Sequence, residues 1–179
     1  MAMALSSNKK RYIIPYRSVV KWMVRLRRSP RAIAGGFALG TFVAFTPTIG
    51  VQFAIVLLLG TVLNMNRPAA LVTIWITNVA TMAPIYTFNY WIGSLLWSGP
   101  STGQVYRVFA DLAAQMMKMN GWEVLEQFKA VMSLSREIII PLIIGSIIVG
   151  LVAALIVYVA SFAMLRYLLI RKHRKRILS

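Results

Sequence analysis

Residues with side chains that can do chemistry are scarce in this chain. The only acids are Asp111, Glu123, Glu126 and Glu137, so the apolar first half has no carboxylate for acid–base catalysis or metal binding. The one histidine, His173, lies among arginines and lysines, and the chain has no cysteine. No recognisable catalytic triad or glycine-rich phosphate motif is present. We therefore expect a protein that is not an enzyme, with no catalytic residue, no metal and no cofactor.

Uncharged polar side chains lie in two otherwise apolar stretches, with one arginine between them. These candidate ligand-binding residues are Thr46, Thr48, Gln52, Arg67, Asn78 and Asn89. Amides and hydroxyls without a carboxylate suit an anion better than a cation, and helix N-termini would add positive partial charge. Two alternatives to ligand binding remain open. The polar side chains could serve only to satisfy main-chain groups freed by the prolines. Arg67 could serve only to extend its charge toward water at the membrane surface.

Helix-breaking residues interrupt both stretches. The first stretch, 32–63, contains TPTIG at 46–50, and the second, 68–97, is interrupted between Asn78 and Pro84. We expect Pro47, Gly50 and Pro84 to break helices there. Each half of the first stretch is too short for the ~30 Å hydrocarbon core of a bilayer. The stretch therefore predicts a re-entrant hairpin or two short packed spans.

Composition and charge place the chain in a membrane. Of its 179 residues, 59% are hydrophobic and 13% charged, against about 25% charged in soluble domains. The net charge is +16, with nine basic residues before Ala32 and six from Arg166 onward. Because both clusters flank apolar runs, they favour cytoplasmic termini over nucleic-acid binding. The first apolar run is too long for a signal peptide.

The pattern predicts an all-α integral membrane fold with three parts. Residues 1–31 are a basic amphipathic segment, 32–165 a single membrane domain, and 166–179 a basic cytoplasmic tail. Within the domain, broken hairpin 32–63 begins and ends inside, and broken segment 68–97 crosses outward. Amphipathic segment 104–137 lies at the interface, and helix 138–165 crosses back. The membrane-surface residues of the first part are Arg17, Lys21, Arg25 and Arg28.

Small residues recur at every fourth position in two of the apolar runs. The expected helix-packing residues are Gly36 and Gly40 in the first run and Gly150 and Ala154 in the last. Such faces allow close helix approach in membranes. The partner helix would come from the same chain or from another copy.

Two sequences resemble a known bacterial family. SPRAIAGGFALGTFVAFTPTIGVQF (29–53) and NRPAALVTIWITNVATMAPIY (66–86) are similar to motifs of the domain of unknown function 2062. The resemblance implies a bacterial inner-membrane protein, sometimes joined to glycosyltransferase domains, with no established activity. The family usually has proline after the asparagine of its second motif, whereas here Val79 follows Asn78. We therefore expect a less pronounced helix break at Asn78, with Pro84 contributing part of it.

Two functions fit these features. The first is binding or moving an anionic lipid or lipid-linked envelope precursor, with anionic phospholipids as partners. The alternative is a structural or assembly subunit that docks through small-residue faces into a homo-oligomer or a larger envelope complex. The first requires Gln52, Asn78, Asn89 and Arg67, and the second the glycine faces.

Overall fold

The described part of the chain is entirely helical. A computed structural model describes residues 29–119 and 123–177, and these contain no strand. The predicted all-α class is confirmed. The elements are α2 (Pro30–Phe45), α3 (Gln52–Val62), α4 (Arg67–Thr73), the 3₁₀ turn η1 (Ile74–Ile76), α5 (Met82–Ser94), α6 (Thr102–Met116), α7 (Val124–Met132) and α8 (Arg136–Ile177). The predicted surface residues Arg17, Lys21, Arg25 and Arg28 lie outside the described residues.

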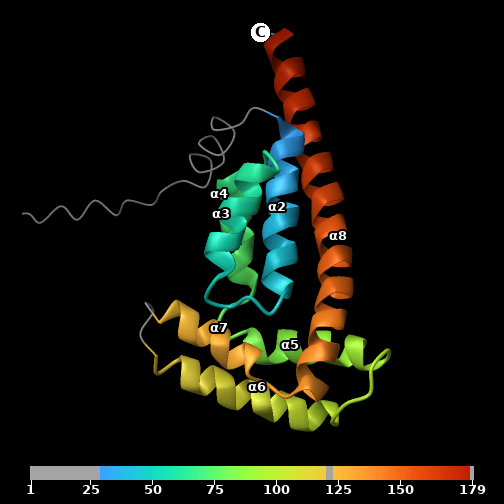
Figure 1. The fold of residues 1–179 in the computed structure, drawn as a ribbon. Coiled ribbons are helices and arrows are strands. Elements are labelled where there is room, and N and C mark those ends of the chain that lie inside the picture. Colours follow the sequence, from blue (N-terminus) through green and yellow to red (C-terminus); the bar gives the residue numbers. More distant parts are fainter. Residues whose placement is uncertain (1–28, 120–122, 178–179) are drawn as a thin grey trace, which may run out of the picture.

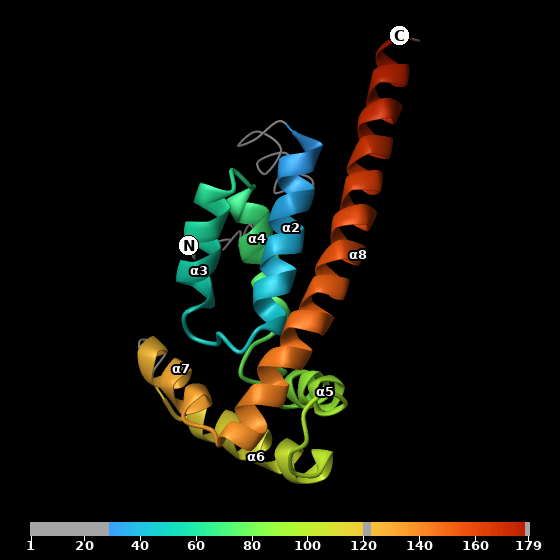
Figure 2. The same ribbon diagram turned by 45° about the vertical axis from the view of Figure 1, so that its right-hand side comes forward.

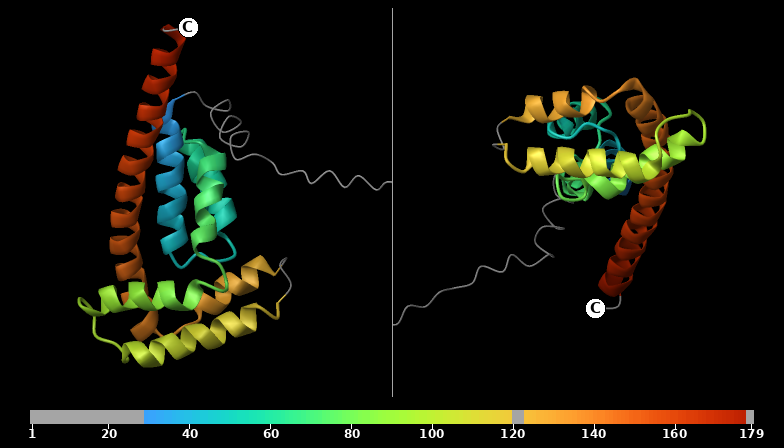
Figure 3. Two further views of the ribbon diagram at one scale, coloured as in Figure 1. Left: turned by 180° about the vertical axis from the view of Figure 1, so that it is seen from behind. Right: turned by 90° about the horizontal axis from the view of Figure 1, so that it is seen from below.

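The helices form two groups that lie across each other. Helices α2, α3 and α4 stand beside α8 as a short bundle, whereas α5, α6 and α7 lie across one end of it as a platform (Figures 1 and 2). Leu165, in the last part of α8, packs against a small cluster formed by Ile33 at the start of α2 and Ala69 of α4. The chain therefore enters α2 and leaves α8 at one end of the bundle, called here the terminal end. The platform closes the other end (Figure 3).

Local sequence explains the helix ends in the first stretch. Pro30 occupies the start of α2, where its missing N–H costs no hydrogen bond. Helix α2 ends at Phe45, two residues before Pro47, and Gly50 has a φ of 89° in the turn that leads into α3. A left-handed conformation of this kind favours glycine. The chain thus folds back between α2 and α3, as the TPTIG sequence predicts.

The second stretch differs from the prediction in two ways. Pro84 lies in the first turn of α5, where a proline is tolerated, so it does not break a helix. The break is made instead by Asn78, whose side-chain oxygen accepts hydrogen bonds from the N–H groups of Ala80 and Thr81 at 2.9 and 3.2 Å. Beyond it α5 turns across the bundle, so α4 and α5 do not run along one direction (Figure 1).

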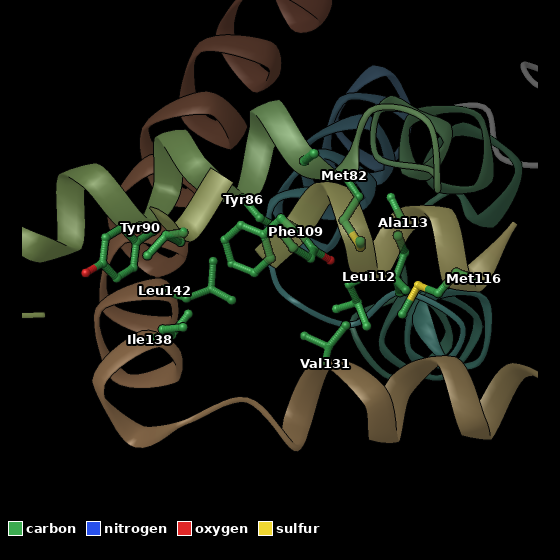
Figure 4. Packing of buried hydrophobic residues seen from close by; sticks show 13 residues of the cluster. Met82, Tyr86, Tyr90, Phe109, Leu112, Ala113, Met116, Val131, Ile138 and Leu142 are labelled. Carbon is green, nitrogen blue, oxygen red and sulfur yellow. The ribbon is translucent and has the colours of Figure 1, made fainter. Parts of the chain in front are cut away.

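The main hydrophobic core lies inside the platform. Side chains of α5, α6, α7 and the start of α8 point toward one another there (Figure 4), with Tyr86 and Phe109 packed edge to face at 5.7 Å. The predicted amphipathic segment supplies most of α6 and α7, and its apolar faces line this core. A second, smaller cluster joins α2, α3 and α4.

Small residues mediate the close helix contacts, and they do so within the chain. A Cβ on Gly36 or Gly40 would overlap main-chain carbonyls at Asn66 and Ala70 near α4, and Gly150 lies against Phe42 of α2. Ala154 is half-buried on α8. The closest approach is one that sequence reasoning missed. Gly93 of α5 faces the carbonyl of Pro141, and Gly145 of α8 faces the carbonyl of Asn89.

One described helix has the length and composition of a membrane-crossing segment. It is α8, of which Arg136–Ile170 is 35 residues long and strongly apolar. The helix starts two residues before the predicted span and continues through the tail to Ile177. Helices α2 and α3 are apolar but have only 16 and 11 residues. The inner-membrane location and the placement of the termini stay predictions.

We predict that Gly145→Ala destabilises the protein. Alanine gains about 1 kcal/mol in helix propensity, but its Cβ would overlap the Asn89 carbonyl, and overpacking of this kind costs about 1–3 kcal/mol or more. Because the obstacle is main chain, we expect the upper end of that range and a net loss. Unfolding in detergent measures it.

Gly103→Ala is the matched control, because a Cβ there meets nothing within 4 Å. It should leave stability unchanged or raise it. Equal stability of the two variants would show that α5 and α8 do not cross at Gly145.

Candidate functional site

The structure separates Arg67 from the other candidate ligand-binding residues. The main-chain N–H of Asn66 donates to Ala32 O at 2.8 Å, which places the start of α4 beside the start of α2. Asn89 instead contacts the end of α2 through Phe45 O. Since α2 has 16 residues, about 24 Å of helix lies between the two points. One ligand headgroup cannot contact both Arg67 and Asn89.

Asn89 joins three helices where the bundle meets the platform. Its side-chain NH₂ donates to Phe45 O at 2.7 Å and to the Ser146 hydroxyl at 3.0 Å, and the side chain is fully buried. Phe45 O is one of the last carbonyls of α2, which have no partner within the helix. The amide therefore satisfies a buried helix end and ties α5 to α2 and α8.

Gln52 makes a longer contact between the two breaks. Its Nε2 donates to Thr77 O at 3.4 Å, and 6% of the residue is exposed. Gln52 is the first residue of α3, and Thr77 follows η1. The contact thus links the loop before α3 to the loop before α5.

The hydroxyl groups at the end of α2 also donate hydrogen bonds to main-chain carbonyls. Thr46 and Thr48 both donate to Val43 O, at 2.7 and 3.3 Å. The Tyr86 hydroxyl donates to Thr46 O at 3.2 Å. Burial raises the pKa of Tyr86, so its hydroxyl remains protonated at any physiological pH and keeps its role as a donor.

At this polar junction, formed by Thr46, Thr48, Gln52, Tyr86, Asn89 and Ser146, the buried side-chain atoms left without a partner are two amide oxygens, which are acceptors. Among the described residues, the buried side-chain atoms without a partner are Gln52 Oε1, Asn89 Oδ1 and the hydroxyls of Thr77 and Thr87. Rotating the Asn89 amide would turn its oxygen toward Phe45 O, which is unfavourable because both atoms are acceptors. The geometry favours the alternative interpretation, in which these amides satisfy main-chain groups freed at the breaks.

Residues at the terminal end surround an open pocket instead. It has a volume of about 610 Å³ and lies between the start of α2, the turn from α3 to α4, and α8. Its lining residues are Ser29, Arg31, Ala32, Gly35, Leu63, Asn64, Met65 and Tyr158. The lining combines one guanidinium and polar groups with apolar side chains. Arg67 is not among them; its Nη1 lies 3.5 Å from the Thr61 hydroxyl.

Acidic and histidine side chains do not gather in the part of the chain that the structure describes. There, no three His, Cys, Asp or Glu residues lie close enough to hold a metal ion. The ion pair between Lys129 and Glu126, at 3.0 Å, is exposed on α7. Neither the polar junction nor the pocket contains a carboxylate from these residues.

Among the described residues, the fold is all-helical and contains one helix long and apolar enough to cross a membrane. Residues 15–174 match the family described as an uncharacterised protein conserved in bacteria, domain of unknown function 2062. The chain belongs to this family, which confirms the resemblance of its two motifs. No curated protein and no solved structure matches the chain.

Sequence reasoning missed Ser146 and Tyr86 as members of the polar junction. Ser146 lies four residues before Gly150, in the uncharged run 138–165, and a hydroxyl in an apolar run of this kind indicates a hydrogen-bond partner nearby. Tyr86 lies in the second family motif, next to Pro84 and Ile85. Its hydroxyl reaches back to the first motif at Thr46.

We predict that Asn89→Leu lowers the free energy of unfolding by about 1–3 kcal/mol, because it leaves Phe45 O buried without a partner. Ser146→Ala should cost less, since Asn89 keeps its bond to Phe45. The double variant should be less destabilised than the sum of the two, because both changes remove the same bond.

The measurement is unfolding of all three variants in mixed detergent micelles, with the exposed Gln115→Leu as control. Strictly additive effects would contradict a direct bond between Asn89 and Ser146.

Proposed function

We propose that this chain is a bacterial inner-membrane protein that binds an anionic lipid, or a lipid-linked envelope precursor, by its headgroup and catalyses no reaction. The observation that carries the proposal is the open pocket at the terminal end, which combines Arg31 with the start of α2. The polar junction, where the same ligand was expected from sequence, contributes to stability instead.

The chemistry of the pocket suits a phosphate group. The Arg31 guanidinium is exposed and can pair with two phosphate oxygens. Helix α2 has Pro30 at its start and no side-chain cap from Ser29, so its positive end remains available to an anion. The pocket volume of about 610 Å³ is within the usual range of roughly 300–1,000 Å³ for ligand sites.

Apolar surface next to the pocket suits acyl chains. On α3, Leu58 and Val62 are 64% and 71% exposed, and on α8 Leu155 is 64% exposed. Exposed apolar surface of this extent is typical of membrane or partner contact. A lipid with its headgroup in the pocket would have its chains along these helices.

Charge supports the same orientation. The start of α2 and the end of α8 lie at the terminal end (Figure 1), and the sequence has nine basic residues before Ala32 and six from Arg166 onward. Clusters of this kind favour the cytoplasmic leaflet, where anionic lipids attract them by about 1 kcal/mol per residue. The pocket would then face the inner leaflet.

The alternative function, a subunit that docks through small-residue faces, has less support. Gly36, Gly40 and Gly150 contact helices of their own chain, so these faces are not open to another copy. A homo-oligomer would have to use other surface, such as the exposed side of α8.

We predict that Arg31→Ala weakens binding of anionic phospholipid by roughly 10–100-fold, the loss expected for about 1.5–3 kcal/mol of charged hydrogen bonding. Native mass spectrometry of the protein in mild detergent, titrated with phosphatidylglycerol, measures it. Arg107→Ala, which removes an exposed arginine from the platform, is the control and should bind as the parent protein does.

Phosphatidylcholine at the same concentrations tests whether the anionic headgroup matters. Equal binding of phosphatidylglycerol by both arginine variants would overturn the assignment of the pocket. A lipid-free oligomer of fixed size, unchanged in either variant, would favour the assembly subunit.

A further inference from the structure

Helix α5 is enclosed on three sides by its own chain. Its Asn89 contacts the end of α2, its Gly93 the main chain of α8, and its Tyr86 ring the Phe109 ring of α6. These contacts come from the bundle above it, the long helix beside it and the platform helix below it (Figures 1 and 3). The remaining side of α5 faces laterally, away from the molecule.

That lateral side carries an apolar and aromatic stripe. Its members recur every three or four residues along α5 and continue past its end. The stripe consists of Pro84, Phe88, Trp91, Leu95, Leu96 and Trp97. Phe88 and Trp91 are 48% and 46% exposed and their rings lie 5.8 Å apart, while Leu95 is 68% exposed. Helix α5 contains no charged residue.

We infer that α5 is an in-plane membrane helix and that its stripe contacts the acyl chains of the outer leaflet. This inference rests on the membrane location in the proposed function and specifies the depth of the platform. The occupant of the stripe is a lipid leaflet rather than a protein partner. The stripe lies on the helix that crosses α8 at Gly145, and it contains aromatic residues of the kind enriched where membranes meet water.

Charged residues mark the water side of the platform. The exposed side of α6, opposite the face that packs on α5, contains Arg107 and Asp111, and Lys118 is exposed just after the helix. Arg136 and Glu137 are exposed at the start of α8. From Arg136 to the crossing at Gly145 is nine residues, or about 13 Å of helix. With the start of α8 among the headgroups, α5 lies at the edge of the hydrocarbon.

The lengths of the helices lead to the same placement. The 16 residues of α2 span about 24 Å, less than the ~30 Å of a hydrocarbon core. A helix lying across the end of α2 adds about 10 Å. Helices α2 and α5 together therefore match the thickness of the hydrocarbon core, which α2 alone does not reach.

The chain has no cysteine, so single cysteines can carry a nitroxide label without further changes. Phe88→Cys and Leu95→Cys report on the stripe, Leu155→Cys on the exposed side of α8, and Gln115→Cys on the polar face of α6. All four positions are exposed, so labelling should not disturb the core. Labelled full-length protein is inserted into vesicles of phosphatidylethanolamine and phosphatidylglycerol.

Accessibility to oxygen, which concentrates in lipid, is compared with accessibility to a water-soluble nickel complex by electron paramagnetic resonance. We expect oxygen to dominate at 88, 95 and 155, with 88 and 95 nearer the headgroups than 155, and the nickel complex to dominate at 115. Two stripe positions keep the test valid if one variant folds poorly.

The outcomes separate this inference from the proposed function. Dominance of the nickel complex at both 88 and 95, with oxygen dominant at 155, would overturn the inference and leave the membrane location intact. Nickel dominance at 155 as well would overturn both. Protection of 88 and 95 from both reagents, with spin–spin broadening between labels, would show a second copy on the stripe and also overturn the inference.

Discussion

The fold depends on how the chain satisfies the end of α2. A helix that ends inside the molecule leaves its last carbonyls without partners, and each would cost free energy in an apolar environment. Asn89 and Tyr86, both on α5, donate to Phe45 O and Thr46 O. Because these donors come from a helix 40 residues further along the chain, α5 must lie across the end of α2. The platform follows from that requirement.

The crossing of α5 and α8 is a consequence of the same contact. Asn89 also donates to Ser146, which is adjacent to Gly145, and the carbonyl of Asn89 lies where a Cβ on Gly145 would be. A short hydrogen bond between two helices requires their backbones to approach closely, and glycine permits this. Gly93 performs the same role one turn further along α5. The glycines and the amide therefore act together, and neither arrangement is possible without the other.

Local features of the fold were predictable from sequence, and long-range ones were not. The break at 46–50 follows from Pro47 and Gly50, whose backbone preferences act within a few residues. The direction of α5 depends on contacts between residues 40 and 44 positions apart, which no periodicity encodes. The same limit explains the error at Pro84, where proline fits a helix start as well as a break. It also explains why the sequence did not predict the position of Arg67, which is close to Gln52 in sequence but lies near the opposite end of the bundle.

The polar junction and the terminal end differ in the groups that they could offer to a ligand. At the polar junction, the NH₂ groups of Gln52 and Asn89 already donate to carbonyls, and the amide oxygens of both residues are buried without a partner. At the terminal end, Arg31 is exposed beside the start of α2, where Ser29 makes no side-chain cap. An anion requires donors and positive charge, so under the proposed function it would bind at the terminal end rather than at the junction. A substitution at the junction that changed lipid binding would have to act by loosening the bundle, because about 24 Å of α2 lies between the two regions.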